Sequence, residues 1–186
     1  MPDKRIKNTS ALNFKDDRLH VKNVSTERPI DRTSDVLTET VTVANTTTET
    51  TLWTGKMNSN SLRAGNMFKI HCDGIVSNGG NTAPDQITIR VRVGGVQIVS
   101  LTPETRSMPV GSHWHIDANA CQRTLGTAGQ RAVHFHLDID DVTEVVVAVA
   151  SVDTTTTDDI TITAQWASAA ADNTISIYQG FMEFKN

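Results

Sequence analysis

DQITIRVRVGGVQIVSL, residues 85–101, contains the pattern that decides the fold class. Apolar and polar residues alternate here with the period of two that is typical of a half-buried strand. One face carries Ile87, Ile89, Val91 and Val93, and the other carries Thr88, Arg90 and Arg92. Gly94 and Gly95 suit the positive φ angles of a tight turn, after which Val96, Ile98 and Leu101 begin a return strand. The stretch predicts a β-hairpin, and we interpret its two arginines as part of a solvated strand face.

From Val36 onward the chain continues in this way and shows no helical periodicity. Alternating or apolar runs separated by polar turns predict about ten strands in all. The other runs are VLTETVTVA, TTLWTGKM, MFKIHCDGIV, HWHIDANACQ, AVHFHLDI, EVVVAVASV, ITITAQWAS and TISIYQGFMEFK. Short strands at such spacing predict an all-β domain over residues 36–186, built as a two-sheet sandwich or a barrel.

The run EVVVAVASV, residues 144–152, is apolar on both of its faces. Val145, Val147 and Val149 would lie on one face, and Val146 and Ala148 on the other. Such a run is typical of a strand that is covered on both sides. We therefore expect Val147→Asp to destabilise the protein by several kcal/mol, about the cost of a buried, unpaired charge.

Residues 1–35 differ from the rest of the chain. They hold eight Lys/Arg and six Asp/Glu, whereas residues 36–186 hold nine and fifteen. Their apolar residues are scattered, and such a segment buries too little surface to offset its ordering entropy alone. We expect an extended arm that becomes ordered on a neighbouring protein, and the alternative is a tail folded back on its own domain. The predicted partner-binding residues are Leu12, Phe14, Leu19 and Val21.

Composition argues against several classes of function. The net charge of −4 gives no general reason to bind nucleic acid or an anionic membrane. No apolar run approaches the roughly 20 residues that span a bilayer, and the N-terminal residues have no apolar core of a secretory signal. The two cysteines, Cys72 and Cys121, are interpreted as free buried thiols, with a disulfide as the alternative.

Four histidines form two His-x-His pairs, which are the clearest candidate metal ligands. His113 and His115 flank Trp114, and His134 and His136 flank Phe135. A hairpin centred near residue 128 would place His136 opposite Ala120 and separate the two pairs by roughly 16 Å. That distance is too long for one ion, so we predict no metal site within one chain. A site across a symmetry axis stays open.

Other candidate sites have ordinary structural interpretations. The acidic groups (Asp138, Asp140 and Asp141, then Asp153, Asp158 and Asp159) lack the spacing of an EF-hand and are interpreted as solvated carboxylates. The tryptophans (Trp53, Trp114 and Trp166) could form a carbohydrate platform, but their place in alternating strands favours core or interface packing. No GxSxG, HExxH, P-loop or GxGxxG motif is present, so neither catalysis nor a cofactor is expected.

Residues 50–186 resemble a group of virion proteins from tailed bacteriophages. The resemblance rests on TLWTGKMNSNSLRAGNMFKI, DQITIRVRVGGVQIVSL, HWHIDANACQRTLG and ITITAQWASAAADNTISIYQGFMEFK, taken in that order. The group has an SLRAGD turn, where this chain has SLRAGN, and an LTIRVKVGG hairpin. The resemblance implies an antiparallel jelly-roll domain, similar to tumour-necrosis-factor-like trimers, of the kind found in capsid decoration and head-fibre proteins.

These observations lead to one leading expectation about function. The chain is expected to be a non-enzymatic capsid decoration protein that trimerises through its jelly roll. Its arm would bind the major capsid protein or a neighbouring virion protein. The alternative is a tail-fibre or head-appendage module that binds glycan on the host surface. In either case the protein would be made in the host cytoplasm and located in the virion, without a nucleic acid or membrane partner.

Overall fold

The computed structural model describes residues 12–15, 18–23, 26–27, 32–79, 85–103, 106–140 and 142–185, with side chains from Ser34 onward. Regular structure in these ranges consists of β-strands. Among the same residues, no helix has the length and hydropathy needed to cross a bilayer.

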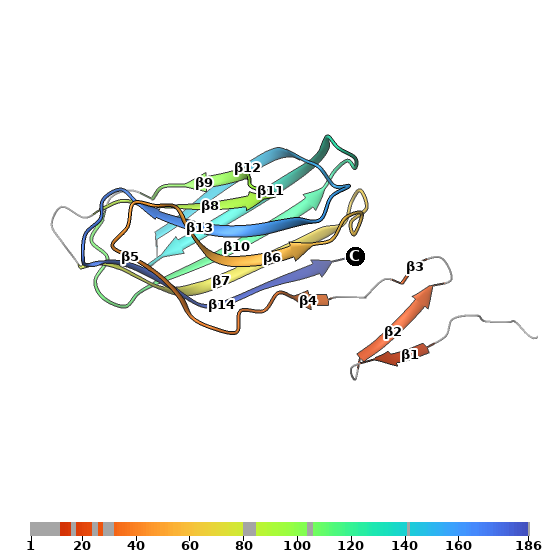
Figure 1. Cartoon of the computed structure of the whole chain (residues 1–186), viewed down its shortest axis with the longest axis horizontal. Coiled ribbons are helices and arrows are strands. Elements are labelled where there is room, and N and C mark those ends of the chain that lie inside the picture. Colours follow the sequence, from red (N-terminus) through yellow and green to blue (C-terminus); the bar gives the residue numbers. More distant parts are fainter. Residues whose placement is uncertain are drawn as a thin grey trace, which may run out of the picture.

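Two antiparallel sheets form the main body of the protein (Figure 1). The seven-stranded sheet contains, in spatial order, β12 (Val142–Val152), β11 (Gly129–Ile139), β10 (Ser112–Gln122), β7 (Met67–Asn78), β14 (Asn173–Lys185) and β4 (Arg32–Ser34), and β5 (Val41–Ala44) also pairs with β14. The four-stranded sheet contains β6 (Thr50–Met57), β13 (Asp158–Trp166), β8 (Ile87–Val93) and β9 (Val96–Leu101). The chain changes sheet repeatedly, from β6 to β7 to β8 and again from β12 to β13 to β14. The predicted all-β, antiparallel, jelly-roll-like sandwich is confirmed.

Three short strands within the predicted arm pair only with one another. They are β1 (Leu12–Lys15), β2 (Arg18–Asn23) and β3 (Thr26–Glu27). Leu12 pairs with Val21 and Phe14 pairs with Leu19 in the β1–β2 register, so the four predicted partner-binding positions are paired with each other. The side chains of these positions lie outside the described residues. Pairing with the sandwich begins at β4, just before the predicted boundary at residue 36.

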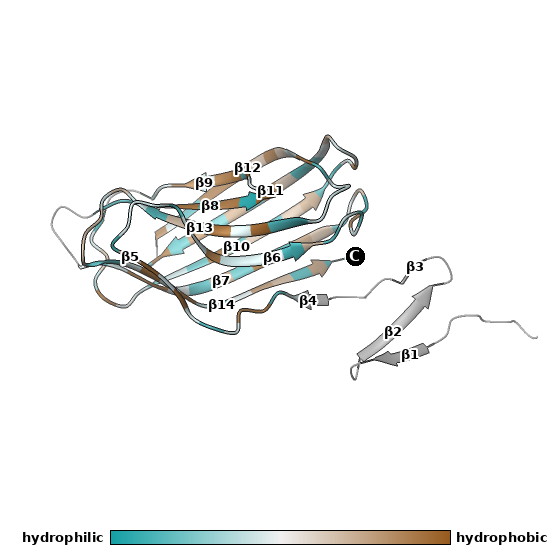
Figure 2. Ribbon diagram, in the orientation of Figure 1, coloured by the Kyte–Doolittle hydropathy of each residue, from teal (hydrophilic) through white to brown (hydrophobic). Residues whose placement is uncertain are grey.

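Alternating burial along the strands separates the core from the surface. Hydrophilic and hydrophobic residues both occur along the strands, as Figure 2 shows. All three tryptophans lie in the core, because Trp53, Trp114 and Trp166 are 3%, 1% and 1% exposed. Trp114 donates from Nε1 to the Ser176 carbonyl at 3.0 Å, so its polar atom is satisfied although buried. Core packing is therefore confirmed for the tryptophans, and none of them is available as a carbohydrate platform.

The β8–β9 hairpin agrees with its prediction at the turn. Gly94 and Gly95 have φ angles of 56° and 79°, the left-handed region that favours glycine. The pairing then shifts after Arg92, which pairs with Gln97 while Val91 pairs with Val99. The bulge leaves Ile98 without a partner in this register and buries Ile98 and Val99 together, whereas Val96 is 53% exposed.

The arginines of β8 form an ion-pair cluster and not the solvated face that the sequence predicts. Arg92 donates from Nε and Nη2 to the two oxygens of Glu49, at 2.6 and 2.8 Å. Arg90 Nη1 lies 3.6 Å from Glu49, and the Thr163 hydroxyl donates to the same carboxylate at 2.6 Å. The hydrogen bond from Arg92 is the main cause that lowers the pKa of Glu49 to about 2, despite partial burial. The segment before β6 therefore covers part of β8, which periodicity alone does not indicate.

A buried polar pair closes the hairpin between β10 and β11. Arg131 is 1% exposed, and its Nε and Nη2 donate to the Gln122 side-chain oxygen at 3.0 and 2.9 Å. Its guanidinium carbon lies 5.1 Å from the centre of the Phe68 ring, within the range of a cation–π contact. Burial lowers the pKa of Arg131 to about 10. Because Gln122 and Arg131 are also register partners, this pair fixes how the two strands align.

The sequence prediction for β12 is wrong. Val145, Val147 and Val149 are 50%, 71% and 52% exposed, whereas Val146 and Ala150 of the other face pack against the core. The strand is the last one of the seven-stranded sheet, and among the described residues no second layer covers its outer face. A run of valine and alanine is equally compatible with this one-sided position, so composition does not reveal it.

We expect Val147→Asp to change the free energy of unfolding of the monomeric protein by less than about 1 kcal/mol, because the new charge is solvated. The matched control is Val133→Asp on β11, where the side chain is 4% exposed, and we expect a loss of several kcal/mol. Urea titration at low protein concentration measures both. Similar losses in the two variants would contradict the assignment of β12 as a one-sided strand.

Glu49→Gln should lower the free energy of unfolding at pH 7 by about 1–2 kcal/mol, the usual size of a charge-assisted hydrogen-bond loss. The folded-state pKa of Glu49 lies at about 2, below its ordinary 4.5, so the contribution is complete above pH 4.5 and is lost as the pH falls towards 2. Urea titrations between pH 7 and pH 2 should therefore show the two proteins converging. Glu183→Gln is the control, because Glu183 is as exposed as Glu49 (26% each) but pairs with the half-exposed Lys185. A gap that stays constant down to pH 2 would refute this role of Glu49.

Candidate functional site

The outer surface of β7, β10 and β11, which we call the polar face, gathers most of the histidines of the chain. Five of the six histidines lie on it, and the sixth is in β2. The five are His71, His113, His115, His134 and His136. Residues between them along the strands, such as Trp114, Ile116 and Phe135, point into the core. The same alternation that builds the core therefore concentrates imidazoles on the opposite surface.

Register across the three strands makes histidine and aspartate alternate. His115 of β10 lies opposite Asp138 of β11 on one side and Asp73 of β7 on the other. Two residues further along the same face, Asp117 of β10 lies opposite His136 of β11 and His71 of β7. Side chains that are directly opposite in antiparallel strands are within contact distance. The polar face is thus a lattice of acid–imidazole neighbours.

One part of this lattice is centred on Asp117. His71 Nδ1 lies 2.8 Å and Lys69 Nζ lies 2.9 Å from the same oxygen of Asp117. Burial raises the pKa of Asp117, but the hydrogen bonds and charges of His71 and Lys69 outweigh it, so the net pKa is below its ordinary value. His71 Nε2 also lies 3.3 Å from Asp73, and its ring packs 5.3 Å from Phe181. Both ring nitrogens of His71 are therefore in contact with a carboxylate.

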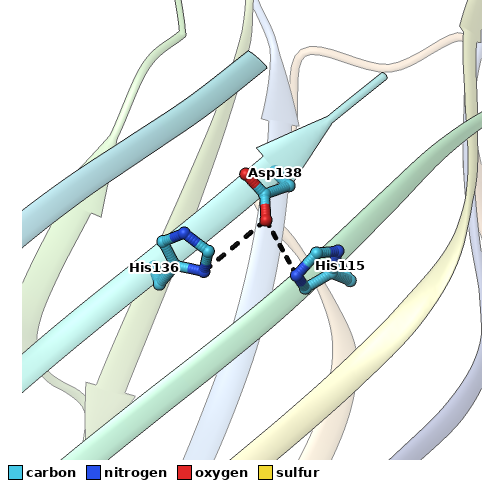
Figure 3. A group of neighbouring side chains, drawn as sticks. All are labelled: His115, His136 and Asp138. Atoms are coloured by element: carbon cyan, nitrogen blue, oxygen red, sulfur yellow. Dashed lines mark ion pairs between the residues drawn. The ribbon is translucent and has the colours of Figure 1, made fainter. Parts of the chain in front are cut away.

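The second part brings together His115, His136 and Asp138 (Figure 3). One oxygen of Asp138, Oδ2, lies 2.8 Å from His115 Nε2 and 3.6 Å from His136 Nδ1. The Thr143 hydroxyl donates to the other oxygen, Oδ1. The two imidazole centres are 5.8 Å apart, and one donor atom from each of the three residues lies within 4.8 Å of the others. Two imidazoles and a carboxylate at these distances are a possible ligand set for a divalent transition metal.

This arrangement corrects the predicted histidine geometry. His136 lies opposite Asp117 and not opposite Ala120, so His115 and His136 are neighbours and not far apart along the sheet. The hairpin is centred between residues 126 and 127, because Gln122 pairs with Arg131. Asp138 was interpreted as a solvated loop carboxylate, yet it belongs to β11 and its side chain is 17% exposed. The predicted strand AVHFHLDI already contains Asp138, but a hairpin centred near residue 128 does not place it opposite His115.

A surface hollow adjoins this group at one end of the sheet. Its lining includes Asp73, His113, His115, Asp138, Asp140, Thr143 and Tyr178. Tyr178 is 53% exposed and lies where the pairing of β14 with β7 is interrupted between Ile177 and Gln179. The bulge turns this residue outward beside the hollow, which is a common effect of such irregularities. The hollow therefore combines carboxylates, imidazoles and one exposed aromatic ring.

The other residues that the sequence offers as site candidates do not extend the polar face into a larger site. Asp153 accepts from the backbone and hydroxyl of Thr155, so it orders its own loop, and Asp141 lies outside the described residues. Cys72 and Cys121 are free thiols, the first buried and the second half-buried, and burial raises the pKa of Cys72. Among the described residues of the polar face, the Thr143 hydroxyl donates its hydrogen bond to the Asp138 carboxylate and not to a histidine, as an activated nucleophile would. The arrangement suits binding better than nucleophilic chemistry.

An apolar border runs along the polar face. Val145 lies opposite His136, Val147 opposite His134 and Val149 opposite Ala132. We call these three valines the valine stripe. Their exposure on the last strand of the sheet makes one continuous surface that is polar over β7, β10 and β11 and apolar over β12.

Distant structural likenesses to viral proteins were found in comparisons with known structures. No family model matches the chain, and no curated protein matches it. The CBM2 module of an evolved Dit from Lactobacillus casei BL23 phage J-1 has 15% identity and a TM-score of 0.33, over 70% of this chain and 67% of that chain. A structure of infectious bursal disease virus, Gt strain, has 8% identity and a TM-score of 0.36, over 95% of this chain and 37% of that chain. Likenesses at this level assign neither family nor function.

Proposed function

We propose that this chain is a structural protein of a virus particle, with the decoration of a phage capsid as its specific role. The observation that carries the proposal is the valine stripe. Its valines are at least half exposed, on an eleven-residue strand that ends the sheet. A long apolar edge strand promotes association, and natural proteins normally cover or interrupt it. A protein that works as part of an assembly needs such a surface, whereas a monomer does not.

The partner at the valine stripe is a second copy of the chain, in a homotrimer. Symmetric self-association places the same apolar surface of each copy against another copy. The resemblance of residues 50–186 to trimer-forming virion domains supports three copies. In such a trimer the valines would be covered, which would remove the aggregation hazard of an open edge.

Attachment to the particle is assigned to residues 1–35. This segment has a net charge of +2, while residues 36–186 have −6, so the two parts suit different surroundings. Leu12, Phe14, Leu19 and Val21 would contact the major capsid protein or a neighbouring virion protein. Three linked arms bind with an avidity that can exceed single-arm affinity by about 10²–10⁴. The role is adhesive and virion-located, and it requires neither catalysis nor a cofactor.

A second candidate function is glycan recognition on the host surface, by a fibre or appendage module. The hollow beside Tyr178 favours it, because an exposed aromatic ring next to carboxylates such as Asp73 and Asp140 suits a sugar. In that case the binding surface would be the sandwich and not the arm.

Self-association provides the first test. Sedimentation of the full chain at tens of micromolar should show a trimer, and Val147→Asp should shift it to a monomer, because three charges would lie at the apolar contact. Val110→Asp is the matched control, since Val110 is 87% exposed but belongs to the loop between β9 and β10 and not to β12. A monomeric wild type, or a Val147→Asp variant that remains trimeric, would rule out this interface.

Particle binding provides the second test and separates the two functions. Removing residues 1–31 keeps β4 and its pairing with β14, and should abolish attachment to particles stripped of the protein. Phe14→Ala should weaken attachment more than Lys15→Ala, because a desolvated aromatic generally outweighs an exposed charge. Pull-downs against particles and against host cells give the readout. Full particle binding by the truncated protein would exclude the arm, and strong cell binding would favour the glycan-binding module.

A further inference from the structure

We propose that His115, His136 and Asp138 bind one divalent transition metal ion per chain, with Zn²⁺ as the expected species. The inference concerns the sandwich alone and does not depend on the virion role. It rests on the convergence of three donor atoms from two paired strands, seen in Figure 3.

The spacing of the donors fits a tetrahedral ion. Zinc binds imidazole nitrogen and carboxylate oxygen at about 2.0–2.2 Å, so neighbouring ligand atoms are about 3.3 Å apart. In the structure, Asp138 Oδ2 lies 2.8 Å from His115 Nε2 and 3.6 Å from His136 Nδ1, and no pair among the three donors exceeds 4.8 Å. Side-chain rotations that move each donor atom by about 1 Å or less would bring these distances to that value. The backbone therefore already holds the ligands where an ion needs them.

Strand geometry explains why the three residues converge. His136 and Asp138 are two residues apart on β11 and therefore share a face, and His115 lies directly opposite Asp138 on β10. Ligands on two paired strands are held by the sheet hydrogen bonds, so metal binding would order little new structure. Such preorganisation favours affinity.

The carboxylate is also oriented by a partner that is not a ligand. Thr143 of β12 donates its hydroxyl to Oδ1 of Asp138, which leaves Oδ2 directed at the imidazoles. Hydrogen bonds of this type commonly fix metal ligands and contribute to affinity. The side chains of Asp138, His136 and His115 are 17%, 29% and 43% exposed, so the group is partly shielded but reachable from solvent.

The surroundings favour a cation. Asp73 faces His115 from β7, Asp117 faces His136 from β10, and Asp140 lines the adjoining hollow. Lys69 is engaged with Asp117 at 2.9 Å. His115, Asp138 and Thr143 also line that hollow, so a fourth coordination position would open towards it and take water or a small anionic ligand. A ligand set of two imidazoles and one carboxylate selects zinc-like ions over Mg²⁺ and Ca²⁺, which prefer oxygen ligands.

The test is calorimetric titration of Zn²⁺ into the full-length chain without a histidine tag, at neutral pH. We expect one ion per chain with a dissociation constant of about 1 µM or lower, as for a well-placed three-ligand set. His115→Ala, His136→Ala and Asp138→Asn should each weaken binding by more than about 10-fold, and Thr143→Val by about 10-fold. Co²⁺ as a coloured substitute should give a visible tetrahedral spectrum in the wild type and lose it in the ligand variants.

The matched control is His134→Ala, which removes an imidazole from the same face but outside the group. It should keep wild-type affinity. Thermal unfolding without metal should be nearly the same in all variants, and added Zn²⁺ should raise the Tm of the wild type and of the control but not of the ligand variants. Absence of saturable Zn²⁺ binding, or equal losses in His134→Ala and His136→Ala, would overturn the proposal.

Discussion

The alignment of β10 with β11 is the constraint on which the rest of the molecular surface depends. At the closed end of this hairpin, the buried guanidinium of Arg131 is hydrogen-bonded to its register partner Gln122. A shift by one residue would separate the two side chains and leave a charge in the core without its acceptor, which is costly. The same shift of β11 would turn His136 and Asp138 inward while His115 stayed on the outer face of β10. One polar pair in the core therefore maintains the arrangement of the polar face.

The outer surface of the seven-stranded sheet combines two kinds of chemistry. Over β7, β10 and β11 it presents alternating acids and imidazoles, and over β12 it presents the valine stripe. The valine stripe lies next to the proposed ion site. Self-association and metal binding can therefore occur on adjacent strands. In the proposed trimer, covering the stripe at Val145 would also exclude water beside His136, its neighbour on β11 and one of the proposed ligands. Assembly and metal occupancy would then influence each other, because a shielded ion site has a lower effective dielectric constant.

How well the sequence predicts the pairing of two strands depends on how clearly it marks the centre of the turn between them. Two adjacent glycines mark the centre of the β8–β9 hairpin, whereas the loop between Gln122 and Arg131 holds two separated glycines, Gly126 and Gly129, so the expected centre near residue 128 is too late. Trp114 and Phe135 both point into the core, so the residue numbers of paired positions must add to an odd number, and a pairing of His136 with Ala120 violates this condition. The edge position of β12 had no signal, since valine runs occur in covered and uncovered strands alike. The binding role of Leu12, Phe14, Leu19 and Val21 stays a prediction.

The central claim is that the β10–β11 register gathers His115, His136 and Asp138 on one face of the sheet. The most direct measurement is a set of cross-strand backbone NOEs in solution, assigned on isotopically labelled full-length protein. The account predicts NOEs that pair His115 with Asp138 and Asp117 with His136. NOEs that instead pair Ala120 with His136 would separate the three side chains and contradict the account.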